Sequence, residues 1–220
     1  MKNWKNIINI KDTLKNTKVL MEKYNDYYWK GFFLNDLIEN FNFKSYLELG
    51  VATGESWYNI NCELKVGVDL NSGIKIENVL TTTTDEYFKN LSEETKFDLV
   101  FIDACHEKSY VKKDFLNSFK HLNDNGIIVF HDIGPWTREI AEPWAGCGNG
   151  YELWIGLSDN YPNNTETFEG LGEHRDYVGL FFKNNLEKID ESLLENTDFG
   201  YDYFEANREK YLFSKKFVFS

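Results

Sequence analysis

Short apolar runs alternate with polar segments of helical spacing from Lys44 onward. Five runs have the near-continuous apolar character of strands buried on both faces of a parallel sheet, namely residues 45–50, 65–70, 78–83, 98–103 and 126–132. Two later runs, residues 166–171 and 177–184, are expected to be antiparallel strands. The alternation predicts an α/β fold, a Rossmann-like, doubly wound and mostly parallel sheet of seven strands with an antiparallel last strand.

Helical periodicity fills most of the intervals between these strands. The predicted helices are Glu55–Cys62, Asp85–Leu91, Ser109–Leu122 and Tyr151–Asn160. Residues 133–150 carry turn residues and two tryptophans, which predicts a loop.

Two amphipathic segments precede the first strand and predict N-terminal helices. Their apolar positions are Leu14, Val19, Leu20 and Tyr24 in the first, and Phe32, Phe33, Leu37, Ile38 and Phe41 in the second. We expect these helices to pack on the sheet edge, with a lid over a substrate pocket as the alternative. The domain prediction is an N-terminal extension at 1–43, the main domain at 44–184 and a C-terminal extension at 185–220 packed on the same domain.

Charge and cysteine usage exclude some classes of protein. The net charge of −12 disfavours a nucleic-acid partner, because an acidic surface repels phosphate backbones. No apolar stretch reaches 18 residues, so no membrane association is expected. Cys62, Cys105 and Cys147 are scattered without a CxxC pair, which favours a reducing compartment and hence the cytoplasm.

A glycine turn follows the first predicted strand, at Glu48-Leu49-Gly50-Val51-Ala52-Thr53-Gly54. Ligands of open α/β sheets bind outside the carboxyl ends of the strands. Asp69 ends the next strand, where an acid accepts hydrogen bonds from ribose hydroxyls. The spacing ExGxxxG lacks the third glycine of dinucleotide enzymes, which opposes a nicotinamide-dependent oxidoreductase. A sulfonium amino acid tolerates this looser turn and favours a nearby acid such as Glu48.

Further polar residues follow the third, fourth and fifth strands. Thr84 and Asp85 open a helix, where they either cap it or face an adenine edge. Four groups converge at the ends of strands four and five: Asp103, His106, His131 and Asp132. Four aromatic residues form either an aromatic wall over an acceptor or part of the core, namely Trp136, Trp144, Trp154 and Tyr151.

Taken together, these motifs resemble class I S-adenosylmethionine (SAM)-dependent methyltransferases, and among them methyltransferase family 24, which includes small-molecule and sugar O-methyltransferases. The resemblance covers roughly residues 44–184. It rests on residues 48–54, Val68-Asp69, residues 98–103 with His106, and residues 128–132.

The resemblance implies that SAM is the cofactor. The residues expected around its methionine part are Glu48, Gly50, Val51, Ala52, Thr53 and Gly54. Asp69 and Leu70 are expected at the ribose, Thr84 and Asp85 beside adenine, and Asp103 near the reacting methyl group. The implied reaction is O-methylation of a small molecule or of a sugar or glycan hydroxyl. The alternative is a catalytically silent SAM-binding module with a structural or regulatory role.

The catalytic chemistry stays open between three hypotheses. Catechol-type relatives place an acid after strand four and an acid–amide pair after strand five, so Asp103 and Asp132 could ligate Mg²⁺ or another divalent cation. Ile133 stands where the amide is expected. The second hypothesis makes His106 or His131 a metal-free general base, and the third gives the histidines only an orienting role. The expected partner is a small-molecule or glycan acceptor, and a homo-oligomer is left open.

Overall fold

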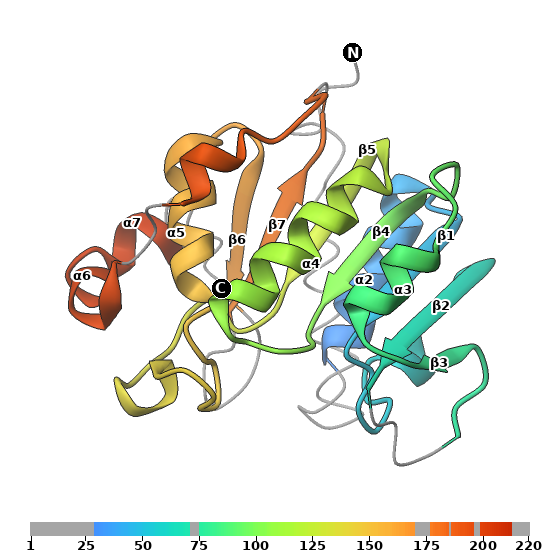
Figure 1. The fold of residues 1–220 in the computed structure, drawn as a ribbon, viewed down its shortest axis with the longest axis horizontal. Helices are drawn as coiled ribbons and strands as arrows, with labels where there is room; N and C mark the ends of the chain where they lie inside the picture. The colour runs from blue at the N-terminus through green and yellow to red at the C-terminus, as the bar shows by residue number, and fades with distance from the viewer. Residues whose placement is uncertain (1–28, 71–74, 170–176, 185, 196–198, 213–220) are drawn as a thin grey trace.

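Seven strands form one sheet in the order β3-β2-β1-β4-β5-β7-β6 (Figure 1). This computed structural model describes residues 29–70, 75–169, 177–184, 186–195 and 199–212. The strands are β1 Ser45–Leu49, β2 Leu64–Asp69, β3 Val79–Thr81, β4 Phe97–Ile102, β5 Leu122–Phe130, β6 Thr165–Glu169 and β7 Tyr177–Phe182. All neighbours are parallel except β7, which is antiparallel to β5 and β6. The predicted fold class is confirmed.

Helices cover both faces of the sheet (Figure 1). They are α2 Trp29–Phe41, α3 Thr84–Asn90, α4 Lys108–Lys120, α5 Tyr151–Asn160, α6 Gly200–Ala206 and α7 Arg208–Leu212. Short 3₁₀ turns are η3 Trp57–Asn59, η4 Glu139–Ala141 and η5 Glu191–Leu194. Helix α2 packs on one face, and α3, α4 and α5 pack on the other. The predicted first amphipathic segment, from Leu14 to Tyr24, lies outside the described residues.

Strand β4 shows why the apolar runs are continuous. Successive side chains of a strand point to opposite faces. Leu99 and Phe101 therefore enter the core beneath α2, whereas Val100 and Ile102 enter the core beneath α4. All four side chains are buried, so both faces of the strand are apolar from Leu99 to Ile102.

The predicted helix at Glu55–Cys62 is wrong, because only the 3₁₀ turn η3 forms there. Side chains from neighbouring elements form hydrogen bonds with the backbone N–H and C=O groups that would pair with each other in a helix. The Asn61 N–H donates to Oδ1 of Asn35 in α2 at 2.8 Å. Lys65 Nζ in β2 donates to the carbonyl of Trp57 at 2.9 Å. Local periodicity cannot detect such partners.

The helix α3 is capped by Thr83, and not by Thr84 or Asp85 as predicted. Thr83 is in the extended conformation, and its hydroxyl oxygen accepts from the Glu86 N–H at 3.1 Å. This is the usual geometry of an N-cap, and it frees Thr84 and Asp85 for contacts with α4.

The C-terminal residues, for which the sequence pattern predicts no elements, form η5, α6 and α7. Leu194, Phe204, Tyr211 and Leu212 are buried in the same core as α4 and α5. The ring of Phe204 lies 5.0 Å from that of Tyr151. The domain boundaries stay a prediction. Among the helices of the described ranges, none combines the length and the apolar character needed to cross a membrane.

Candidate active site

The turns that follow β1 and β4 touch at the carboxyl edge of the sheet. The Asp103 N–H donates to the carbonyl of Leu49 at 2.8 Å. Gly50 has a φ of +89°, and a Cβ added there would lie 2.2 Å from the carbonyl oxygen of Asp103. A side chain at this position is excluded both by the left-handed backbone and by the space. The glycine turn and the fourth-strand acid are thereby fixed next to each other.

Asp69 organises the backbone of the glycine turn. Its Oδ2 accepts from the Val51 N–H at 2.9 Å and from the Ala52 N–H at 2.7 Å. Ala52 has a φ of 47°, an uncommon conformation for a residue with a Cβ. The carboxylate that ends β2 therefore stabilises a turn in which two backbone amides point toward it. Thr53 and Leu70 are exposed at the same edge.

Gly54 closes the turn against the segment that follows it. Its φ is +88°, and a Cβ would lie 2.6 Å from the ring of Tyr58. The Gly54 N–H donates to the Val51 carbonyl at 2.8 Å. The second glycine of the motif is therefore needed for the packing of the turn itself.

Glu48 lies buried beneath the turn and has two partners from the protein. The Tyr46 hydroxyl donates to its Oε2 at 2.7 Å, and the Ser56 hydroxyl donates to its Oε1. Burial raises the pKa of Glu48 to about 7, although the hydrogen bonds from Ser56 and Tyr46 oppose the shift. Sequence reasoning missed both partners. Tyr46 was detectable, because residues two apart on a strand share a face.

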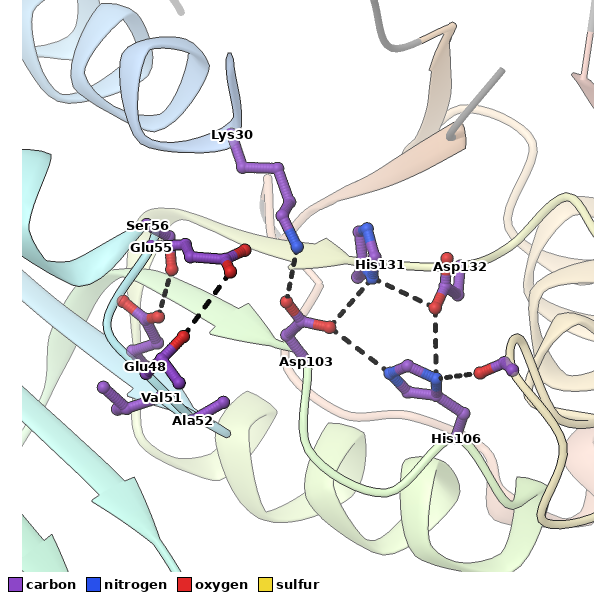
Figure 2. Close-up of polar contacts among 12 residues, drawn as sticks. Lys30, Glu48, Val51, Ala52, Glu55, Ser56, Asp103, His106, His131 and Asp132 are labelled. Carbon is purple, nitrogen blue, oxygen red and sulfur yellow. Dashed lines mark hydrogen bonds and ion pairs between the residues drawn. The ribbon is translucent and has the colours of Figure 1, made fainter. Parts of the chain in front are cut away.

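Asp103 is the centre of a charged cluster (Figure 2). Its Oδ1 lies 2.8 Å from His131 Nδ1 and 3.3 Å from His106 Nε2. Its Oδ2 lies 3.1 Å from Lys30 Nζ. Burial alone would raise the pKa of Asp103, but the charges of His131 and Lys30 hold that pKa well below its usual range. The carboxylate is therefore ionised.

Asp132 is the second carboxylate of the cluster. β5 ends at Phe130, so Asp132 lies in the loop, with a φ of 54°. Its Oδ2 lies 3.1 Å from His106 Nδ1 and 3.2 Å from His131 Nδ1. Burial would raise the pKa of Asp132, and the charge of His131 outweighs this and lowers it. All four residues that were predicted at the strand ends thus lie together.

The two histidines differ in exposure and in charge. The His131 side chain is 9% exposed and that of His106 is 23% exposed. Burial would lower both pKa values, but the acids reverse this: Asp103 and Asp132 raise the pKa of His131 to about 10, and they raise that of His106 above its usual value. The His106 Nδ1–H also donates to the Gly146 carbonyl at 2.8 Å, which ties the loop after β5 to the cluster.

Lys30 is a further site residue that sequence reasoning missed. It comes from α2, which contributes no strand to the sheet, and its side chain reaches Asp103 (Figure 2). One signal was available, since Lys30 is the single basic residue in the α2 sequence. That signal shows a charge on an amphipathic helix and does not show its partner 73 positions later.

Thr84 and Asp85 point toward α4. Asp85 Oδ2 lies 3.2 Å from Lys113 Nζ. The Thr84 side chain forms a hydrogen bond with Asp114, whose pKa burial raises to about 7. Their expected position beside adenine stays a prediction.

The aromatic residues separate into two groups. Tyr151 and Trp154 are buried in the core, which is the packing role that was left open for them. Trp136 and Trp144 are exposed, at 44% and 73%. Trp144 contacts Tyr110 edge to face at 5.9 Å between ring centroids. An acceptor wall made of all four residues is therefore wrong for Tyr151 and Trp154.

The ligand atoms that lie close together are not the predicted metal pair of Asp103 and Asp132. Asp103, His106 and His131 each offer one ligand atom, and these atoms lie within 4.8 Å of one another. Two imidazoles and one carboxylate suit a transition metal better than Mg²⁺, which prefers oxygen ligands. Ile133, at the expected amide position, is an apolar and buried residue.

Comparison with known proteins agrees with this architecture. Residues 75–133 match the family model of methyltransferase family 24, a methyltransferase domain. An O-methyltransferase from Bacillus cereus, solved in complex with SAH (S-adenosylhomocysteine), is 17% identical with a TM-score of 0.56, over 78% of this chain and 91% of that one. The O-methyltransferase TomG from Streptomyces achromogenes, involved in tomaymycin synthesis and solved with SAM, is 14% identical with a TM-score of 0.50, over 78% and 90%. No curated protein matches significantly.

These findings define the class of the protein. The family match confirms the predicted resemblance to methyltransferase family 24, and the solved structures confirm the Rossmann-like methyltransferase fold. Residues 75–133 thus match a methyltransferase domain, and the chain has the fold of this class. The matched segment contains Asp103, His106, His131 and Asp132, whereas the glycine turn and Asp69 precede it.

Proposed function

We propose that this protein transfers the methyl group of SAM to a hydroxyl of a small molecule or glycan. One observation carries the proposal: the Asp103 cluster lies directly against the glycine turn, where the Asp103 carbonyl fills the space above Gly50. Side chains that can accept or donate a proton thereby lie next to the position expected for the cofactor. The similar structures from Bacillus cereus and Streptomyces achromogenes are O-methyltransferases, which supports the same reaction.

The residues at the carboxyl edge fit a nucleoside cofactor. Asp69 and the turn that it orders would hold the ribose and the methionine part, and Thr84 and Asp85 lie at the start of α3 for the adenine. When bound, SAM supplies a methyl group that is already activated on a sulfonium. The chain then has to align the acceptor, which is worth roughly 7–11 kcal/mol in well-oriented reactions.

An alcohol acceptor must also lose its proton, and His106 is the base that we propose. Its side chain is 23% exposed, against 9% for His131, so an acceptor hydroxyl can reach it more easily. His131, with a pKa of about 10, stays protonated and stabilises negative charge. His106 would take the proton of the acceptor hydroxyl as that oxygen receives the methyl group that SAM would supply, with SAH as the leaving product.

Titration calorimetry with SAH and a product assay with isotopically labelled SAM test the proposal. We expect SAH to bind, and His106→Gln to lower kcat by about 10²–10⁴-fold on a responsive acceptor while leaving SAH affinity unchanged. His121→Gln is the matched control, because His121 lies at the far end of α4 and bonds to the Thr95 carbonyl at 2.9 Å. Absence of SAH binding ends the proposal. SAH binding without product across a broad acceptor panel favours the silent module.

The cellular setting is part of the same proposal. Cys62, Cys105 and Cys147 are scattered along the chain without a CxxC pair, which supports a reducing compartment such as the cytoplasm. The acidic net charge of −12 supports a small or glycan acceptor over a nucleic acid.

A further inference from the structure

Lys30 is fixed in the cluster by the packing of α2. Its neighbours Trp29 and Gly31 are buried. A Cβ on Gly31 would lie 2.7 Å from the Cβ of Asn59 and 2.9 Å from the Ser56 carbonyl, so α2 approaches the segment after the glycine turn very closely. Such a fit leaves the helix little room to withdraw the Lys30 side chain from the site.

The Lys30 ammonium lies near both buried acids of the site. It is 3.1 Å from Asp103 Oδ2, and both side chains are largely buried, at 17% and 15% exposure. Its charge also acts on Glu48, whose pKa it lowers against the effect of burial. Figure 2 shows the Lys30 side chain descending from α2 to Asp103, with Glu48 on its other side. The positive charge of Lys30 therefore acts both on Glu48, under the glycine turn, and on Asp103, after β4.

The carboxylate oxygens that a hard cation needs are already engaged. Asp103 presents Oδ2 to Lys30 and Oδ1 to His131. Asp132 presents Oδ2 to both imidazoles. A divalent ion on Asp103 would also share that carboxylate with the Lys30 ammonium, and like charges at such range repel strongly where water is scarce. The donor set of this chain does not fit the acid–acid–amide cation site of catechol-type relatives.

We propose that Lys30 is the cation of this site: it supplies, from the N-terminal helix, the positive charge that a divalent metal supplies in those relatives. As a positioning residue, Lys30 holds the Asp103 carboxylate in its orientation toward His131 and His106. The inference rests on the proposed function for its catalytic meaning, but the metal prediction stands on the geometry of the protein alone.

The experiment titrates the full chain, without substrate, with Mn²⁺ followed by electron paramagnetic resonance and with Co²⁺ followed by visible absorption. We expect the wild type to show no stoichiometric site below about 1 mM. Lys30→Met should uncover a site for one of these ions on the Asp103 cluster. Lys30→Arg keeps the charge and should behave as the wild type.

Activity supplies the second readout. Lys30→Met should lower kcat/KM by about 10- to 100-fold, the usual effect of losing a supporting partner of a reacting group. Lys30→Arg should restore most of it, and a chelator should leave the wild type unaffected. If Lys30→Met fails to fold, the metal titrations of the wild type and of Lys30→Arg still show whether the site binds a divalent ion.

Two results would overturn the proposal. One is a wild type that binds one Mn²⁺ or Co²⁺ per chain and loses activity on chelation. The other is a folded Lys30→Met that neither gains a metal site nor loses activity. SAH binding is measured on the same samples, so a failure of the proposed methyl transfer is recognised separately from the metal result.

Discussion

Glu48 and Asp103 are two buried carboxyl groups on adjacent strands of one sheet, and their pKa values are shifted in opposite directions. Glu48 faces the hydroxyls of Tyr46 and Ser56, and burial raises its pKa to about 7. Asp103 faces Lys30 and His131, and its pKa is held well below its usual range in spite of burial. The two pockets therefore differ above all in the charge of the partners that face the carboxyl group.

The difference shows what each pocket can do. Hydroxyl donors satisfy the hydrogen bonds of a carboxyl group without balancing its charge, so removal from water decides the protonation of Glu48. Fixed cations balance the charge of Asp103, which stays an anion at neutral pH, keeps His131 protonated and orients the His106 ring. The charged pocket suits chemistry, and the neutral pocket suits support of the turn above it.

Asp103→Asn should have the largest effect, because it leaves Lys30, His106 and His131 with one carboxylate in place of two. We expect a loss of about 3–5 kcal/mol in the free energy of unfolding, as is typical when one partner of a buried ion pair is removed. We also expect kcat/KM to fall at least about 100-fold. Urea denaturation and the labelled-SAM assay measure these effects. Asp124→Asn, at a side chain that is 96% exposed, is the matched control and should change neither.

The pH dependence of stability should reveal His131. Its pKa is about 10 in the folded protein and near 6.5 when unfolded, so its contribution is fully present below pH 6.5 and is lost as the pH rises toward 10. Between these values we expect the free energy of unfolding to fall by about 1.4 kcal/mol per pH unit from this group. Denaturation series from pH 6 to pH 10 check this, and His131→Gln should remove the slope. An unchanged slope in that variant contradicts the charge assignment.

The sequence predicts the sheet well because a buried strand is recognisable from its own apolar run, as residues 98–103 are for β4. Convergence of Asp103, His106, His131 and Asp132 was predictable for a related reason, since the carboxyl ends of neighbouring parallel strands share an edge. Both inferences need only local pattern and general topology.

Features that depend on contacts between distant elements could not be predicted. Lys30 reaches Asp103 from a helix 73 positions earlier, and no local sequence pattern predicts this contact. The helix predicted at Glu55–Cys62 does not form because Asn35 and Lys65 bind its backbone from other elements. Glu48 is on the strand where the motif puts it, but it faces the hydroxyls of Tyr46 and Ser56, and burial raises its pKa to about 7.

Glu48→Gln should have the smallest effect, and it should stabilise the protein. Glu48 has a pKa near 4.5 when unfolded and about 7 when folded, so the wild type loses stability as the pH rises from 4.5 to 7. Glutamine keeps an oxygen acceptor for one hydroxyl and carries no charge to desolvate. We expect a gain of about 1–3 kcal/mol at pH 8 and a smaller gain at pH 5, measured by urea denaturation.

Glu94→Gln, at an exposed acid, is the control and should give no pH-dependent difference. SAH affinity provides the second readout for Glu48→Gln. Unchanged affinity together with the stability gain identifies Glu48 as support for the glycine turn. A variant that is less stable than the wild type at both pH values would mean that Glu48 is ionised and charge-balanced like Asp103, and the contrast between the two pockets would then be wrong.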